Sequence, residues 1–162
     1  MNSAKKIVGL SKLKNLLRRK KRAGKTVAFT NGCFDLLHKG HVSYLEEAKK
    51  PNRILVIGLN SDVSVRRIKG KKRPIVHQSE RARVLASLAC VDYVTLFNEE
   101  TPYNLIKAVK PDILIKGADW KGKTLVGEDL VRAGGGRVEF IKYLKNFSTT
   151  KIIKAIFRKC AK

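Results

Sequence analysis

Short apolar runs alternate with amphipathic segments along most of the chain. Apolar runs of about four to eight residues between turn signals predict buried strands, whereas apolar residues at every third or fourth position predict helices. The strands predicted in this way are residues 27–29, 53–59, 91–97, 112–115 and 137–141. Asn31 and Gly32 are expected to end the first strand, and Pro51 and Asn52 separate the next helix from the second strand.

The helical pattern is found between these strands. The predicted helices are residues 4–22, 38–50, a segment after residue 62, and residues 80–89, 102–109, 124–133 and 149–159. Strands that alternate with helices indicate a parallel sheet covered on both faces. With right-handed crossovers, the sequence predicts an α/β fold, a single doubly wound, Rossmann-like domain with five parallel strands.

The first 24 residues form a distinct segment of the sequence. Ile7, Leu10, Leu13, Leu16 and Leu17 recur at helical spacing among lysines and arginines. Residues 1–24 are therefore predicted to be a basic amphipathic helix that precedes a domain of residues 25–162. Binding to a membrane surface and packing of the apolar face onto the domain are both open interpretations.

Composition places the chain among globular proteins. It has 162 residues, 43% of them hydrophobic, which suits one domain with one core. No apolar run approaches the ~20 residues of a membrane span, and the basic start lacks the apolar core of a secretory signal. The cysteines Cys33, Cys90 and Cys160 are scattered, which favours reduced thiols in the cytoplasm over a disulfide framework.

The net charge of +23 is extreme and raises the question of a polyanionic partner. Only residues 18–22 and 69–73 form dense cationic clusters, and aromatic residues, at 7%, do not interleave with them to stack bases. We therefore expect a basic surface with a positive pocket for polyphosphate, and no stable nucleic-acid partner. A nucleic-acid-binding protein remains the alternative of a different class.

Three polar segments follow predicted strands: residues 30–35, 60–62 and 116–119. Ligands of doubly wound sheets bind beyond the carboxyl ends of the strands, so these distant segments should meet in one crevice. Asn60 and Asp62 also have a simpler interpretation as caps of the following helix, and Ser148 could cap the last one.

The most informative stretch is residues 27–41, where a strand and a glycine turn lead to His38, Gly40 and His41. Histidines three residues apart lie on one side of a helical first turn, next to the positive end of the helix dipole. Together with Gly32 and Gly40, which permit close backbone approach, they predict a phosphate site. A zinc site with Cys33, Asp35 or His77 as further ligands is the alternative.

Residues 117–124 match the Walker A pattern GxxxxGKT. We reject a P-loop here because only one strand follows, without an aspartate for magnesium, and because an acid and an indole occupy the loop. Residues 134–136, three glycines between a helix and a strand, are interpreted as a helix C-cap and turn.

The motifs as a set resemble the HxGH signature family of cytidylyltransferase-like nucleotidyltransferases, in order and in spacing. They are residues 29–35, 38–41, 58–62, 73–75, 80–82, 90–94, 116–119 and 148–150. Within this superfamily, the chain is most similar to the adenylyltransferase domains of the ADP-heptose synthase family, over roughly residues 25–157. The match departs from the pattern at Lys151, where the family usually has arginine.

The resemblance implies a reaction of ATP with D-glycero-β-D-manno-heptose 1-phosphate that yields ADP-heptose and pyrophosphate for lipopolysaccharide core or related glycans. It implies Mg²⁺ as cofactor, bound as much by substrate as by protein, and a homodimer. A cytidylyltransferase for glycerol phosphate or another alcohol phosphate, and an inactive regulatory relative, are the alternatives within the family.

The resemblance also suggests roles for individual residues. The catalytic pair is His38 and His41. The residues expected to bind nucleotide or phosphate are Asn31, Gly32, Cys33, Phe34, Gly40, Lys49, Lys116, Gly117, Ser148, Thr149 and Thr150. Those expected beside the sugar phosphate are Asp35, Asn60, Asp62, Arg73 and Asp119.

Overall fold

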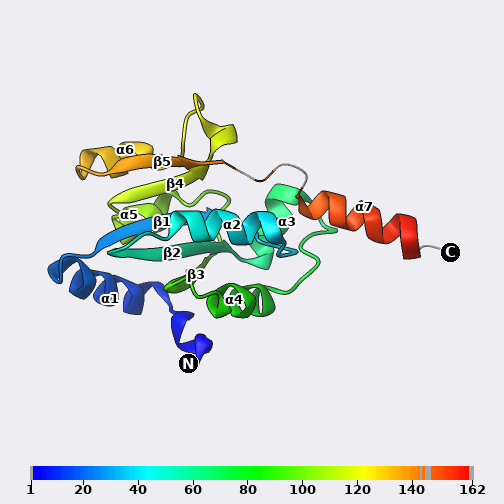
Figure 1. Ribbon diagram of the computed structural model, residues 1–162, viewed down its shortest axis with the longest axis horizontal. Coiled ribbons are helices and arrows are strands. Elements are labelled where there is room, and N and C mark those ends of the chain that lie inside the picture. Colours follow the sequence, from blue (N-terminus) through cyan, green and yellow to red (C-terminus); the bar gives the residue numbers. More distant parts are fainter. Residues whose placement is uncertain (1, 143, 145–146, 161–162) are drawn as a thin grey trace.

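The structure, a computed structural model, describes residues 2–142, 144 and 147–160. Its centre is a sheet of five parallel strands in the order β3-β2-β1-β4-β5, which confirms the predicted fold (Figure 1). The strands are β1 (Thr26–Gly32), β2 (Arg53–Asn60), β3 (Tyr93–Phe97), β4 (Ile113–Gly117) and β5 (Arg137–Ile141).

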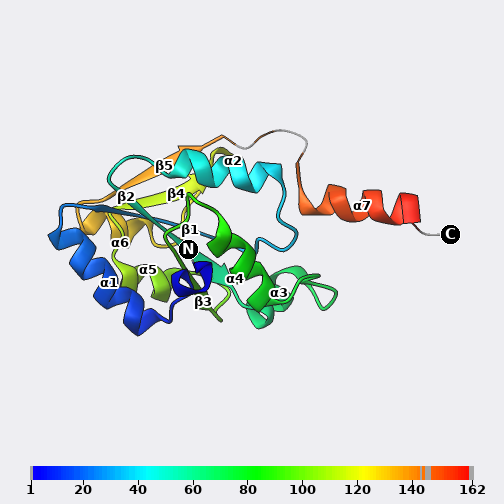
Figure 2. The same ribbon diagram turned by 60° about the horizontal axis from the view of Figure 1, so that its bottom comes forward.

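Helices connect the strands and cover both faces of the sheet (Figures 1 and 2). The α-helices are α1 (Leu10–Arg22), α2 (Lys39–Ala48), α3 (Asp62–Lys69), α4 (Gln78–Ser87), α5 (Tyr103–Val109), α6 (Glu128–Ala133) and α7 (Thr149–Cys160). Two short 3₁₀ helices, η1 (Ser3–Lys6) and η2 (Ala118–Trp120), complete the described elements. In both views α7 projects away from the sheet.

Alternate residues of each strand supply two apolar layers, as the period of a β-strand requires. On one face Ala28 and Leu55 pack with side chains of α2 and α4. On the other face Val27 and Phe29 pack with side chains of α1, α5 and α6. The strands are therefore buried on both sides, which explains their nearly continuous apolar sequences.

The amino-terminal helix packs on the sheet, so its apolar face belongs to the domain core. Leu13 is 0% and Leu17 is 2% exposed. The predicted single helix over residues 4–22 is wrong in one respect, because η1 and α1 are separate. Between them Ile7 forms a bridge with Val94, and the Val8 N–H donates to the Val94 carbonyl at 2.9 Å. This extended segment covers the edge of β3.

Other boundaries differ for local reasons. Residues 124–127 are not helical, because Gly127 takes a left-handed conformation (φ 82°) immediately before α6. A Cβ at Gly127 would lie 2.7 Å from Ile106 Cδ1, so the tight packing of this turn requires glycine. The strand β1 continues through Asn31 and Gly32, and His77 caps α4.

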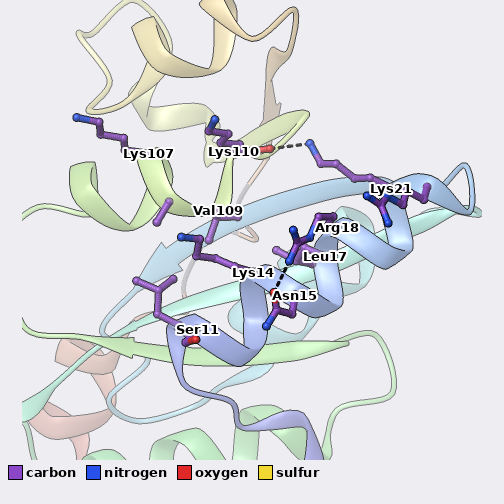
Figure 3. A pocket seen from close by; sticks show the side chains of 12 residues that line it. Ser11, Lys14, Asn15, Leu17, Arg18, Lys21, Lys107, Val109 and Lys110 are labelled. Carbon is purple, nitrogen blue, oxygen red and sulfur yellow. Dashed lines mark hydrogen bonds between the residues drawn. The ribbon is translucent and has the colours of Figure 1, made fainter.

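A groove of about 960 Å³ separates α1 from α5 and is lined by cations from both helices (Figure 3). Lys14, Arg18 and Lys21 come from α1, whereas Lys107 and Lys110 come from α5 and its C-cap. Lys21 is ion-paired with Asp112 at 2.7 Å. None of the predicted site residues lines this groove. Within the described residues, no helix combines the length and apolar character needed to cross a bilayer.

Packing of α1 on the sheet predicts the effect of shortening one leucine. Leu13→Ala should lower the free energy of unfolding by about 2–5 kcal/mol, because it leaves a cavity in the core. Leu10→Ala is the matched control, since Leu10 lies on the same helix and is 38% exposed. It should cost about 0.5 kcal/mol or less. Urea unfolding measures both, and equal effects would show that α1 is not packed on the core.

Candidate active site

A cleft of about 540 Å³ opens at the carboxyl ends of β1, β2 and β4. The sheet order makes this the topological switch point, because the chain runs from β1 to β2 and β3 on one side and then crosses to β4 on the other side of β1. Most predicted site residues line it: Asn31, Gly32, Cys33, Phe34, Asp35, His41, Asn60, Arg73, Lys116, Gly117, Thr149 and Thr150.

The two histidines form a stacked pair at the start of α2. His38 is the N-cap residue and His41 belongs to the first turn. Their ring centroids are 3.8 Å apart and the ring planes are inclined by 20°. The Nδ1 atoms of both rings are buried, and neither has a hydrogen-bond partner among the described residues. Two orphaned imidazole nitrogens next to a helix N-terminus are suited to bind an anion.

Burial keeps these imidazoles neutral. It lowers the pKa of His41 to about 4, with a further contribution from the charge on His38. Burial also lowers the pKa of His38. At neutral pH each ring therefore offers one N–H donor and one acceptor nitrogen. An anion bound between the rings would favour their protonated forms, so charge on the imidazoles can develop together with negative charge on the ligand.

Glycines and an aromatic ring fix the position of the pair. A Cβ on Gly40 would lie 3.1 Å from His38 Nδ1 and 3.0 Å from Phe147 Cβ. A Cβ on Gly32 would lie 3.0 Å from the ring of Phe34, which stands 5.1 Å from the ring of His41. Phe34 itself has a left-handed backbone (φ 44°), a conformation that is costly for a non-glycine residue and typical of functional sites.

Lys116 joins the two sides of the switch point. Its Nζ donates to Asn31 Oδ1 at 2.6 Å and thereby connects the end of β4 to the end of β1. Burial lowers the pKa of Lys116 to about 8. Asn31 accepts from one of the three ammonium donors, and a bound anion could accept from another.

Asp35 and Arg73 act together at the opposite wall. The carboxylate of Asp35 accepts hydrogen bonds from Arg73 Nε and from the backbone N–H groups of Ile75 and Val76, the latter two at 2.8 and 3.0 Å. The side chain of Asp35 is only 1% exposed. Its oxygens are thus occupied by protein donors, and it presents Arg73 to the cleft.

Asp62 was predicted beside the sugar phosphate, but the structure does not bring it into the cleft lining. Its Oδ1 accepts a hydrogen bond from Arg81 Nη2 at 2.7 Å. Burial acts to raise the pKa of Asp62, but hydrogen bonds from the Arg81 side chain and the Gln78 backbone N–H, together with the charges of Arg81 and His77, lower it. Asp62 is the counter-ion of the buried Arg81, which is an ion-pair residue rather than a ligand.

Lys49 and Asp119 also lie outside the cleft lining, as do His38, Gly40 and Ser148, which neighbour the lining residues His41 and Thr149 in the sequence. Lys49 follows α2 at the amino ends of β2 and β3, where it pairs with Asp92 and donates to the Arg53 carbonyl at 2.6 Å. Lys49 was a plausible phosphate ligand by its charge alone, but its position in the fold excludes contact with the cleft. Asp119 is exposed on η2 and does not line the cleft.

The last helix begins at the cleft. Ser148 Oγ accepts a hydrogen bond from the Lys151 N–H at 3.2 Å, which confirms the capping interpretation. Thr149 Oγ1 donates to the Leu36 carbonyl at 3.5 Å, and both Thr149 and Thr150 line the cleft. The start of α7 therefore lies beside the start of α2, where Phe147 is close to Gly40, and the two threonines line the same cleft as His41.

The alternative sites receive little support from the geometry. His77 caps α4 and lies 3.2 Å from Asp62, while Asp35 is occupied by Arg73, so neither joins the histidine pair as a zinc ligand. The described residues contain no cluster of three or more His, Cys, Asp or Glu side chains suited to a metal ion. No helix starts at Thr124, as a P-loop would require, because α6 begins at Glu128.

Sequence reasoning missed several residues of the cleft. The lining also contains Tyr44, Ile68, Lys69, Glu100, Thr101, Pro102, Trp120, Leu125 and Val126. Trp120 follows the motif 116–119 directly and had been weighed only as an argument against a P-loop. Its position one residue beyond a strand-end motif was the signal that could have identified it.

Comparisons with known proteins identify the family of the chain. Residues 29–155 match the cytidylyltransferase-like family model. The chain is 54% identical to bifunctional protein HldE of Syntrophotalea carbinolica, with 89% of this chain and 29% of the relative covered. It is 50% identical to bifunctional protein HldE of Geobacter metallireducens, with 97% and 32% covered. The chain thus spans about a third of the length of these relatives.

A solved structure is similar as well. The lipopolysaccharide core biosynthesis protein from Thermoplasma volcanium GSS1 superposes with a TM-score of 0.60 and 31% sequence identity. The match covers 75% of this chain and 98% of that one. The doubly wound sheet with paired histidines at its switch point defines an α/β protein with a candidate anion site. The chain belongs to the cytidylyltransferase-like family.

The lowered pKa of Lys116 predicts how anion binding depends on pH. Below pH 8 the ammonium is charged, and above it the charge is lost, so the affinity for tripolyphosphate should fall as the pH rises through about 8. Isothermal titration between pH 6.5 and 9.5 measures this. In Lys116→Arg, where the charge persists, the fall should disappear. A wild-type profile without an inflection near pH 8 would show that Lys116 does not contact the anion.

Proposed function

We propose that the chain is an adenylyltransferase that joins ATP to D-glycero-β-D-manno-heptose 1-phosphate and releases pyrophosphate. The observation that carries this proposal is the stacked pair of His38 and His41, whose buried Nδ1 atoms have no partner within the described residues. Burying such atoms costs free energy unless a ligand forms hydrogen bonds with them. The cleft in front of them is of a size that suits a nucleotide.

In the proposed reaction, an oxygen of the sugar 1-phosphate attacks the α-phosphorus of MgATP. The bond from that phosphorus to the bridging oxygen breaks, and pyrophosphate leaves with the electron pair. Such transfers depend on alignment and on stabilisation of negative charge, and they need no covalent intermediate with the protein. Burial raises the pKa of the Cys33 thiol, which also makes this residue unsuited as a nucleophile.

The residues take distinct roles in this scheme. His38 and His41 donate hydrogen bonds to the triphosphate and become more basic as its charge develops. Lys116 and the start of α7, with Thr149 and Thr150, hold the outer phosphates. Arg73, held in place by Asp35, is the cation for the phosphate of the sugar.

Magnesium enters this proposal as part of the nucleotide substrate. The cleft has no preformed cage of carboxylates among the described residues, and the buried Asp35 already accepts three hydrogen bonds. Mg²⁺ commonly keeps water and phosphate oxygens as ligands, so the triphosphate can hold most of its coordination.

The choice of heptose is supported by sequence similarity. Motifs 116–119 and 148–150 match the ADP-heptose synthase family, and relatives about 50% identical to the chain are named bifunctional protein HldE. The similar solved structure is that of a lipopolysaccharide core biosynthesis protein. Supply of an activated heptose for lipopolysaccharide or a related glycan is therefore the role that we propose.

Cell location and assembly are further parts of the proposal. The scattered cysteines Cys33, Cys90 and Cys160 support a reducing, cytoplasmic environment. A homodimer is expected from the family resemblance alone.

Pyrophosphate release tests the proposed reaction. The assay combines ATP, CTP, GTP or UTP with heptose 1-phosphate, glycerol 3-phosphate or no acceptor, always with magnesium. We expect release with ATP and heptose 1-phosphate. His38→Ala should reduce kcat by about 10²–10³-fold, as loss of a transition-state donor does.

Lys49→Ala is the matched control for this assay, because it removes a predicted phosphate ligand that the structure places elsewhere. Its kcat should stay within about twofold of the wild type, and a thermal melt verifies folding of both variants. Release only with CTP and glycerol 3-phosphate would retain the mechanism but reject the substrates. No release with any pair, from a folded sample, would reject nucleotidyl transfer.

A further inference from the structure

The two sides of the cleft differ in chemistry. On the side of β2, most of its lining side chains are polar or charged, among them Asn60, Lys69, Arg73 and Glu100, with the aliphatic Ile68 beside them. On the side of β4, it contains an indole and two aliphatic side chains, those of Trp120, Leu125 and Val126. The histidine pair, at the end of β1, lies between the two, since β1 is the strand between β2 and β4.

Trp120 is the most conspicuous group on the β4 side. It is the only tryptophan of the chain, and it is 43% exposed although it lines a cavity. Val126, also in the lining, is 38% exposed. Large apolar side chains left open at a cleft are suited to cover an apolar surface of a ligand.

The indole is held in position by its own loop. Trp120 ends η2, which follows β4 directly, and its carbonyl accepts a hydrogen bond from the Lys123 N–H at 3.1 Å. The Nζ atoms of Lys116 and Lys123 stand 5.8 and 5.7 Å from the ring centroid. These distances are near the outer limit of about 6 Å for cation–π contacts, so both ammonium groups lie near the ring without close contact.

Of the substrates in the proposed reaction, only the nucleotide carries a planar apolar group, its base. A sugar phosphate has hydroxyl and phosphate groups throughout and fits the polar side. We propose that Trp120 is a stacking platform for the nucleobase and favours purine over pyrimidine nucleotides. This inference rests on the proposed nucleotidyl transfer and deepens it, because it assigns the choice of base to one residue.

The preference follows from the area of the two bases. Base–aromatic stacking contributes about 5- to 150-fold in affinity per base, and it grows with the overlapping surface. A purine has two fused rings and a pyrimidine has one, so stacking on the indole should increase the affinity for a purine nucleotide more. Lys116 precedes Trp120 in the sequence and Lys123 follows it, and both would bring positive charge to the phosphates of the same nucleotide.

Titration of the single tryptophan tests the platform without requiring catalysis. MgATP, MgCTP and tripolyphosphate are added to the wild-type chain, and indole fluorescence is recorded. We expect MgATP to change the emission of Trp120 strongly, MgCTP less, and tripolyphosphate little although it binds. An identical change with all three probes would overturn the proposal, because it would report phosphate and not base.

Calorimetry of variants measures the contribution of the ring. Trp120→Ala should weaken MgATP binding by about 5- to 150-fold and MgCTP binding by a smaller factor, which lowers the ratio between them. Trp120→Phe, which keeps a smaller ring, should retain most of the preference. Tripolyphosphate affinity should be unchanged in Trp120→Ala. Phe157→Ala, at an aromatic residue 68% exposed on α7, is the matched control and should bind both nucleotides normally.

The outcomes separate this inference from the proposed function. Unchanged MgATP affinity in Trp120→Ala, or an equal loss for MgATP and tripolyphosphate, overturns the platform even if the enzyme transfers nucleotides. The expected nucleotide selectivity together with no pyrophosphate release for any acceptor retains the platform and rejects the proposed reaction.

Discussion

The buried guanidinium of Arg81 is the interaction on which the shape of the site depends. It donates to the Cys33 carbonyl beyond β1, to the Asn60 carbonyl at the end of β2 at 2.9 Å, and to the Val76 carbonyl at 3.0 Å. Its charge is balanced by Asp62 at 2.7 Å. Removing one partner of a buried pair typically costs about 3–5 kcal/mol, so these segments form one rigid unit.

This unit explains why residues far apart in the sequence meet in the cleft. The loop after β1 carries Cys33 and Phe34, and the hydrogen bond from Arg81 to the Cys33 carbonyl fixes its position. On the β4 side, Lys116 donates a hydrogen bond to Asn31 at the end of β1. The ends of β2 and β4 are therefore both connected to the end of β1, through Arg81 and Lys116 respectively. The histidines then need no anchoring bonds of their own at Nδ1, because packing against Gly40 and Phe34 fixes them. Both Nδ1 atoms are thus buried without a hydrogen-bond partner among the described residues.

The absence of side chains at two glycines is as important as the charges. At Gly32 and Gly40 a Cβ would press on Phe34 or His38. The imidazoles, the aromatic ring and the backbone therefore occupy a space that any larger residue would disturb. Preorganisation of this kind lets donors act on developing charge without rearrangement.

The sequence was most informative where local patterns determine structure. Apolar runs such as 53–59 are buried on both faces, which gave the parallel sheet, and the sheet in turn predicted that Asn31, Asn60 and Lys116 would meet. Residue type alone was less informative. Lys49 and Asp62 looked suitable by charge, but their ion pairs with Asp92 and Arg81 are long-range contacts that no local pattern encodes.

Two further differences have the same origin. The segment Ile7–Val8 leaves the helical pattern because it pairs with Val94, which is distant in sequence. Trp120 was overlooked because the sequence pattern alone does not bring Leu125 and Val126 into the same cleft lining. Tertiary contacts, and not propensity, decide both cases.

The most direct test of the account is a crystal structure of the chain with magnesium and α,β-methylene-ATP, which cannot be cleaved at the reacting bond. The account predicts that the triphosphate lies between the His38–His41 pair and the start of α7, within hydrogen-bonding distance of both rings. A nucleotide bound instead in the cationic groove between α1 and α5, with the histidine nitrogens still unpartnered, would contradict it.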